Sequence, residues 1–172
     1  MSKRDKGASS TGYMEEGYAP EAVVNYLSLL GWSPKDGREK LEREEVIRLF
    51  DLGSINRKNA QFDLDKCVWL NGQYLQQLSI GGYLEMARPF LLAGGIQWTD
   101  DARMEAALGL VREKVKLFSE LPLWVAYFFG DDFVVDDESV VRVLGKEGAG
   151  DRLKAVLNAF GALGNWDSAS LE

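Results

Sequence analysis

The sequence contains no histidine and a single cysteine, Cys67. Without histidine, the chain cannot offer an imidazole as a metal ligand, a general base or a proton shuttle. One cysteine can form neither a disulfide framework nor a cysteine-based zinc site within the chain. We therefore expect no metal site here.

The sequence also lacks any apolar run near the roughly 20 residues that a membrane-spanning helix needs, and it shows no signal-peptide pattern. Hydrophobic residues make up 46% of the 172 residues, which is enough to bury the core of one large domain or two small ones. These features predict a globular, cytoplasmic protein that does not enter a membrane.

Positive charge is scarce, because 20 lysines and arginines stand against 27 acidic residues and the net charge is −7. The excess of acidic residues lies in the second half of the chain, whereas the first six residues hold Lys3, Arg4 and Lys6. Nearby cations, and not the total charge, neutralise phosphates. An RNA-binding surface could therefore exist only as local patches.

Apolar residues recur with helical spacing along most of the chain, and no alternating strand pattern of useful length is present. Pro20 and Glu21 suit a first helical turn, and Gly31 suits its end. Similar patterns predict helices at 43–50, from Asp63, from Asp100 or Asp101 to about Glu120, at 137–144 and at 151–163. The pattern predicts an all-α fold.

Three features modify this helical pattern. Asn71-Gly72 interrupts the helix that begins at Asp63, and Pro89 limits the helix that follows Gly81-Gly82. The segment Leu121–Phe129 is strongly apolar but short, which favours a buried helix over a membrane element.

Several side chains are candidates for binding chemistry. The glycine-containing segment Ser2–Gly7, which its polar sequence predicts to be a mobile loop, could close over a phosphate, although a basic tail is more often solvated. Aromatic residues could stack on bases, but their positions near helical faces favour core packing. These aromatic residues are Tyr13, Tyr18, Tyr26 and Trp32.

The acidic clusters Asp131-Asp132 and Asp136–Glu138 lack the spacing of a calcium loop, so solvated turns and a helix start are favoured. No pair of carboxylates is placed for acid–base catalysis, and no nucleophile has an evident base. The residues alone therefore indicate a helical protein with a basic loop and no complete catalytic site.

An ordered series of motifs resembles the glutamyl-tRNA synthetases, which are class I aminoacyl-tRNA synthetases. Met1-Ser2-Lys3-Arg4 with Gly7-Ala8-Ser9 resembles their lysine signature loop. The following motifs keep the family's order: Gly17–Ala22, Asn25–Leu27, Leu30–Ser33, Phe62–Lys66, Trp69–Tyr74, Arg88–Leu91, Trp98 and the run 112–129.

This resemblance covers essentially the whole chain and implies its domain organisation. Residues 1–12 correspond to the signature loop, 13–80 to the helical stem-contact domain, and 81–165 to the first helical-bundle domain that binds the anticodon. Residues 166–172 correspond to the opening of the last helical domain. The chain is thus expected to be a C-terminal part of a bacterial-type enzyme, without the Rossmann catalytic half.

The resemblance also implies ligands. Lys3 matches the lysine that contacts ATP, Lys66 matches a basic position that faces the tRNA backbone, and Lys114 falls where the family often has an arginine near the anticodon bases. The whole enzyme would use ATP with Mg²⁺, glutamate and the tRNA for glutamate. We expect this chain to be a monomer, without bound cofactor and inactive as a ligase by itself.

Two other functions remain open at this point. The chain could be a stand-alone helical RNA-binding module, or a protein-interaction adaptor without catalysis, as its acidic second half allows. RNA binding that weakens steeply with salt would separate the first from the second, because phosphate contacts release counterions.

Overall fold

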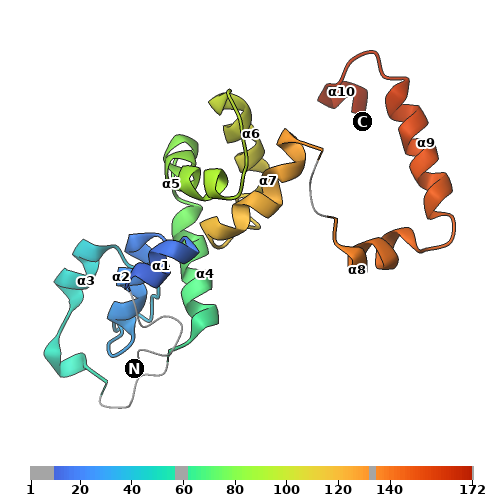
Figure 1. The fold of residues 1–172 in the computed structure, drawn as a ribbon. Helices are drawn as coiled ribbons and strands as arrows, with labels where there is room; N and C mark the ends of the chain where they lie inside the picture. Colours follow the sequence, from blue (N-terminus) through green and yellow to red (C-terminus); the bar gives the residue numbers. More distant parts are fainter. Residues whose placement is uncertain (1–9, 57–61, 132–134, 172) are drawn as a thin grey trace. The chain divides into compact units, whose positions relative to one another are not determined.

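The computed structural model describes residues 10–56, 62–131 and 135–171. Every regular element in these ranges is a helix; Trp32 and Ile55 form an isolated antiparallel bridge, and the described ranges contain no strand (Figure 1). The predicted all-α fold is therefore confirmed. The chain divides into two compact units, residues 1–133 and residues 134–172.

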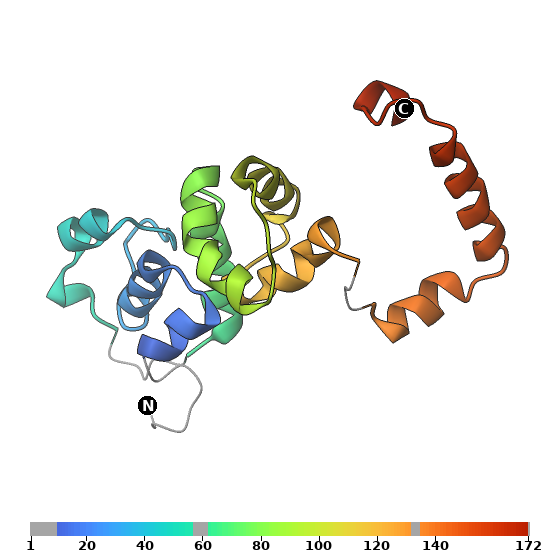
Figure 2. The same cartoon turned by 45° about the horizontal axis from the view of Figure 1, so that its top comes forward.

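The first unit contains two groups of helices. The α2 helix packs against α3 and α4, and α5, α6 and α7 pack against one another, as Figures 1 and 2 show. Its elements are α1 (Ser10–Glu16), α2 (Pro20–Leu29), α3 (Arg43–Leu49), η1 (Leu52–Ser54), α4 (Leu64–Leu75), α5 (Ile80–Ala93), α6 (Asp101–Val111), η2 (Phe118–Glu120) and α7 (Leu121–Phe129).

The second unit consists of α8 (Asp137–Ser139), the π-helical η3 (Val140–Leu144), α9 (Ala149–Gly161) and α10 (Ser168–Leu171). The Asp136 carboxylate accepts a hydrogen bond from the Ser139 amide at 2.7 Å and so caps α8. This confirms the helix-start interpretation of that acidic cluster. Ala149 is the one buried hydrophobic residue among the described residues of this unit, whose helices therefore bury little.

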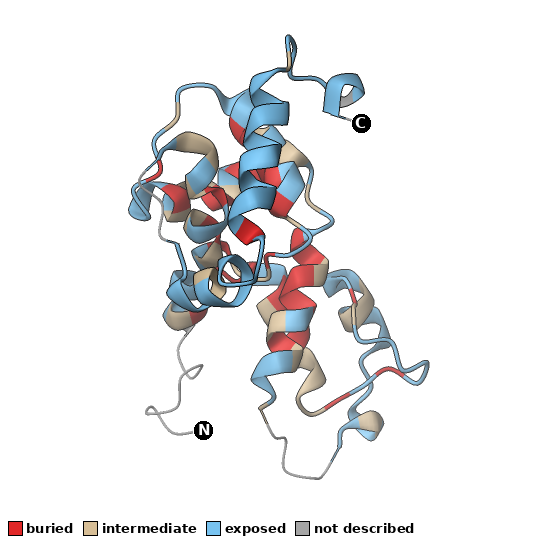
Figure 3. Cartoon of the chain, turned by 90° about the vertical axis from the view of Figure 1, so that its right-hand side faces the viewer, coloured by how far each residue is buried: buried red, intermediate tan, exposed pale blue. Residues whose placement is uncertain are grey.

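The core of the first unit is rich in aromatic rings. Tyr13, Tyr18, Tyr26 and Trp32 are all buried, which confirms the prediction that they belong to the core. The rings of Tyr13 and Tyr18 meet edge to face at 5.3 Å. The Tyr26 hydroxyl accepts from the Asp63 amide at 2.7 Å and donates to the Asp63 carbonyl at 2.8 Å. Buried residues line the helices of this unit in Figure 3.

A buried asparagine joins three distant segments of the first unit. Asn71 lies in α4 with no exposed surface. Its Oδ1 accepts from the Ala19 amide at 2.8 Å, directly before α2, and its Nδ2 donates to the Lys116 carbonyl at 2.6 Å. A buried polar backbone group costs roughly 1–3 kcal/mol when it loses its partner. Asn71 therefore fixes α2 and the segment before η2 against α4.

The predicted break at Asn71-Gly72 was wrong, because α4 runs unbroken from Leu64 to Leu75. Asparagine and glycine are weak helix formers, but tertiary contacts override this propensity. A Cβ on Gly72 would lie 2.6 Å from Cδ of Lys116. Gly72 thus leaves room for the segment whose carbonyl Asn71 binds.

The expected long helix from Asp101 to about Glu120 ends at Val111. The chain turns there, and the Glu120 carboxylate accepts from the amides of Lys116 and Leu117 at 3.0 and 3.3 Å, which starts η2. Gly17, with φ of +84°, lies directly against this turn, and its carbonyl accepts from the Phe118 amide at 3.2 Å. The helical spacing of apolar residues extends beyond Val111 in the sequence because Phe118, which follows the turn, is also buried in the core.

One further expectation was wrong, and another was only partly right. Pro89 lies inside α5, which continues to Ala93 because buried Leu91 still packs into the core. The α7 helix is buried on one side only, at Leu121 and Val125, while its other side faces solvent. A short apolar helix at the edge of a small unit has too few neighbours to cover its whole circumference.

Replacement of Asn71 by alanine should destabilise the first unit by about 2–4 kcal/mol, since it leaves the buried Ala19 amide and the partly buried Lys116 carbonyl without this partner. Urea denaturation followed by circular dichroism measures this change. Gln77→Ala, at an exposed position just after α4, is the matched control and should shift stability by less than about 0.5 kcal/mol. Equal midpoints for both variants would contradict the role given to Asn71.

Candidate nucleic-acid interface

The first of the three predicted site residues, Lys3, lies outside the described residues. Its predicted role at an ATP site therefore stays a prediction. Lys66 and Lys114 both lie in the first unit, and each has its own partners.

Lys66 lies in the first turn of α4. Its backbone amide donates to the Asp63 carboxylate at 3.0 Å, the bond that caps this helix. Its ammonium forms an ion pair with Oε1 of Glu39 at 2.6 Å, and both side chains remain partly open to solvent. A phosphate that approached Lys66 would compete with this carboxylate. An anion can therefore bind the Lys66 ammonium only by displacing Glu39.

Lys114 follows the end of α6 and is exposed. Its amide donates to the Val111 carbonyl at 2.9 Å, which holds the turn after the helix. Its ammonium lies 5.6 Å from the ring centroid of Trp124 in α7. A cation within about 6 Å of an aromatic face is attracted by the ring quadrupole. The structure thus pairs this predicted site residue with an aromatic side chain that the sequence analysis did not single out.

The neighbouring Arg112 has a structural role. Its Nη2 donates to the carbonyl of Leu78 at 3.1 Å and to that of Gln76, just after the end of α4, and its guanidinium lies over the Tyr83 ring at 5.5 Å. Cations at the C-terminal end of a helix satisfy its orphan carbonyls and its dipole. Arg112 therefore ties α4 to the turn after α6 and is not free to meet a phosphate.

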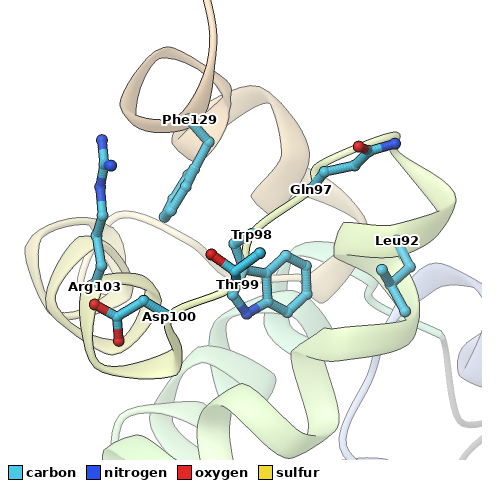
Figure 4. Close-up of a pocket in the computed structure, with 7 residues that line it drawn as sticks. All are labelled: Leu92, Gln97, Trp98, Thr99, Asp100, Arg103 and Phe129. Carbon is cyan, nitrogen blue, oxygen red and sulfur yellow. The ribbon is translucent and has the colours of Figure 1, made fainter.

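An open pocket of about 580 Å³ lies beside the start of α6 (Figure 4). An arginine lies over each of its two aromatic rings. The guanidinium carbon of Arg88 is 5.4 Å from the ring centroid of Trp98, and that of Arg103 is 5.3 Å from the ring centroid of Phe129. The lining residues are Leu92, Gln97, Trp98, Thr99, Asp100, Arg103 and Phe129.

Hydrogen bonds also restrain the groups around this pocket. The Trp98 indole donates to the Asp101 carboxylate at 2.8 Å, and Arg103 donates to the Phe128 carbonyl at 2.7 Å. Arg88 pairs with the same Asp101 at 2.9 Å, and these two bonds lower the pKa of that carboxyl. The charged groups around the pocket are thus paired with one another or with backbone, and little unpaired charge faces the pocket.

Reactive groups are poorly placed for catalysis in the described part of the chain. Cys67 is 1% exposed, and burial raises the pKa of its thiol to about 11, so it is almost wholly protonated at neutral pH. The described ranges hold no cluster of three acidic or cysteine side chains able to bind a metal ion, and no helix among them is long and apolar enough to cross a membrane.

Comparison with known families identifies the chain. Residues 83–172 match the model of the anticodon binding domain, and residues 1–69 match that of the catalytic domain of class I tRNA synthetases for E and Q. The chain belongs to the glutamyl-tRNA synthetase family. The expectation drawn from its motifs is confirmed, and the helical pattern after residue 82 now coincides with the anticodon-binding match.

Individual members of the family are clearly similar to this chain. The glutamate–tRNA ligase of Akkermansia muciniphila is 42% identical over 143 residues, which are 83% of this chain and 32% of that enzyme. That of Methylacidiphilum infernorum is 42% identical over 150 residues, or 86% and 34%. The chain thus spans about a third of the length of its curated relatives.

A solved member of the family has the same fold. The glutamate tRNA ligase from Elizabethkingia meningosepticum, solved in complex with its amino acid, superposes with a TM-score of 0.72 at 28% identity. The match covers 89% of this chain and 30% of that one. The predicted boundary between residues 80 and 81 is tested by none of these comparisons and stays a prediction.

Glu39→Gln should strengthen binding of tRNA at low salt by about 2- to 5-fold, because an exposed ion pair of about 0.4–1 kcal/mol would no longer compete with phosphate for Lys66. Filter binding or fluorescence anisotropy measures this effect. Glu44→Gln removes one carboxylate from α3, outside this ion pair, and serves as the charge-matched control. Equal affinities for the two variants would show that Lys66 does not meet the RNA.

Proposed function

We propose that this chain is the tRNA-gripping part of a glutamate–tRNA ligase. The observation that carries the proposal is the match of residues 83–172 to the anticodon binding domain, preceded in the same chain by a match to a class I synthetase. The described helices supply a folded surface with local cations, and they supply no reactive group. Such a surface suits docking of RNA and leaves the chemistry to another part of the enzyme.

In this proposal, residues 13–80 contact the inner side of the tRNA stem and residues 81–165 approach the anticodon. Lys66 faces the sugar–phosphate backbone, where it exchanges Glu39 for a phosphate. Lys114 meets the anticodon loop. A lysine is a point charge without the planar fork of arginine, so it holds a phosphate well but reads a base edge less selectively.

The whole enzyme would activate glutamate with ATP and Mg²⁺, and would then transfer the glutamyl group to the 3′ end of the tRNA. Lys3, in the loop Met1-Ser2-Lys3-Arg4, would contact ATP and stabilise the negative charge that develops on the phosphates during adenylate formation. We further propose that the chain acts as a cytoplasmic monomer, as befits a translation enzyme.

Binding of tRNA should be measurable at low salt and weaken steeply as salt rises. With two to four phosphates neutralised, the affinity should fall about 10- to 100-fold between 50 and 200 mM salt, since each contact releases counterions. Fluorescence anisotropy with labelled tRNA for glutamate measures the slope. Absence of binding at 50 mM salt would instead favour a protein-interaction adaptor.

The 172 residues alone should not attach glutamate to tRNA, because they span only about a third of the length of the related glutamate–tRNA ligases and the reaction needs ATP, glutamate and the tRNA 3′ end to be held together. The test is an aminoacylation assay with radioactive glutamate, ATP, Mg²⁺ and tRNA for glutamate. A full-length glutamate–tRNA ligase is the positive control for the tRNA and reagents. Charging above background by the isolated chain would overturn the division of labour proposed here.

A further inference from the structure

The α7 helix exposes a large part of its apolar surface. Leu123 is 76% exposed, Tyr127 50% and Trp124 36%, while Leu121 and Val125 are fully buried. Because helical residues three and four positions apart share a face, Trp124 and Tyr127 lie on one side of α7. Exposed apolar patches on a folded surface mark sites of interaction. The exposed apolar side of α7 therefore indicates a binding partner, and the side chains around it indicate the class of that partner.

The exposed indole is accompanied by a positive charge. The Lys114 ammonium lies 5.6 Å from the centre of the Trp124 ring. The backbone that carries this lysine is held on both sides: Lys114 itself donates to Val111, and the Lys116 amide donates to Glu120 at 3.0 Å. An aromatic face beside a cation is an arrangement that binds an unstacked base and its phosphate in single-stranded nucleic acids.

We propose that Trp124 is a base-stacking platform for an unstacked nucleotide of RNA, and that Lys114 holds the phosphate of that nucleotide. This inference rests on the proposed tRNA-binding function and names a residue that carries part of it. Both residues fall within the match to the anticodon binding domain, so the nucleotide belongs to the single-stranded loop of the tRNA and not to a paired stem.

Two residues of the exposed face distinguish an RNA partner from a protein partner. A protein interface would use Leu123 most, because it is the most exposed apolar side chain on α7. A base would instead use the flat indole and the adjoining cation, and Leu123 would contribute little. The two kinds of partner therefore predict opposite rankings of Leu123→Ala and Trp124→Ala.

Stacking also determines what the platform selects. Every base has a π face, and Lys114 offers a point charge without the two parallel donors that read a base edge. The pair should therefore add affinity for an unpaired nucleotide without strong preference among the four bases.

The test compares variants of the full 172-residue chain for binding of tRNA for glutamate and of its isolated, unmodified anticodon stem-loop. Trp124→Ala should weaken both about 5- to 10-fold, the low end of the cost of removing one stacking aromatic ring. Trp124→Phe should retain most of the affinity, whereas Trp124→Leu, which keeps apolar bulk without a π face, should lose as much as alanine.

Two matched controls accompany these variants. Trp69 on α4 is 45% exposed, and Trp69→Ala should leave binding of the isolated anticodon stem-loop within about 2-fold of the wild type, as should Leu123→Ala. Lys114→Ala should weaken binding about 2- to 4-fold, and the double variant with Trp124→Ala should lose less than the product of the single losses, because the two residues act on one nucleotide. Urea denaturation verifies that each variant is folded.

Fluorescence gives a readout that a purely structural role would not move. The chain has five tryptophans, and stacking of a base on Trp124 should quench part of their emission when the stem-loop is added. The quenching should disappear in Trp124→Phe and persist in Trp69→Phe.

The outcomes separate this inference from the function on which it rests. If the wild-type chain binds no RNA at low salt, the proposed function fails and the inference falls with it. If the wild type binds and folded Trp124→Ala binds equally well, the tRNA function stands and the stacking platform is refuted. A larger loss from Leu123→Ala than from Trp124→Ala would refute it as well, in favour of an apolar protein contact.

Discussion

The side-chain amide of Asn71 is the interaction on which the first unit depends. Its two hydrogen bonds join segments 52 and 45 residues away along the chain, and the Ala19 residue whose backbone N–H it binds is buried, so this N–H group has little access to water as an alternative partner. The amide determines where α2 begins and where the chain turns before η2. Lys114 lies in that turn. The hydrogen bond between Asn71 and the Lys116 carbonyl therefore helps to set the position of the Lys114 cation on the surface.

A second consequence of the fold is that several cations of the described residues are already engaged. Arg112 binds carbonyls at the end of α4, Arg88 pairs with Asp101, and Lys66 pairs with Glu39. In a chain with a net charge of −7, such pairing reduces the positive charge that the described surface offers to RNA, so docking should be local and sensitive to salt. It also gives aromatic contacts more weight, because stacking on a base needs no excess of positive charge.

The sequence predicted the elements better than their ends. The helices at residues 20–29, 43–49 and 137–144 follow local signals such as Pro20 and the Asp136 cap, which act within one turn. The errors arose where a distant partner outweighs local preference. The α4 helix continues through Asn71-Gly72 because Asn71 forms hydrogen bonds with Ala19 and Lys116 from that position. The helix from Asp101 stops at Val111 because Glu120 caps the next turn. Among the site residues, Lys66 and Lys114 were indicated by family resemblance, but neither Glu39 nor Trp124 could be assigned to them.

The sequence by itself thus determined the all-α class, the family and the aromatic core of the first unit, because these follow from short-range periodicity and an ordered series of motifs. Only the tertiary structure decided which cations are paired and which side of α7 stays exposed. Glu39 meets Lys66 and Trp124 meets Lys114 across loops whose path no local rule specifies. The apolar run Leu121–Phe129 is typical of a buried segment in the sequence, yet its helix has neighbours on one side alone. The side exposed to water is the one that carries the Trp124 indole.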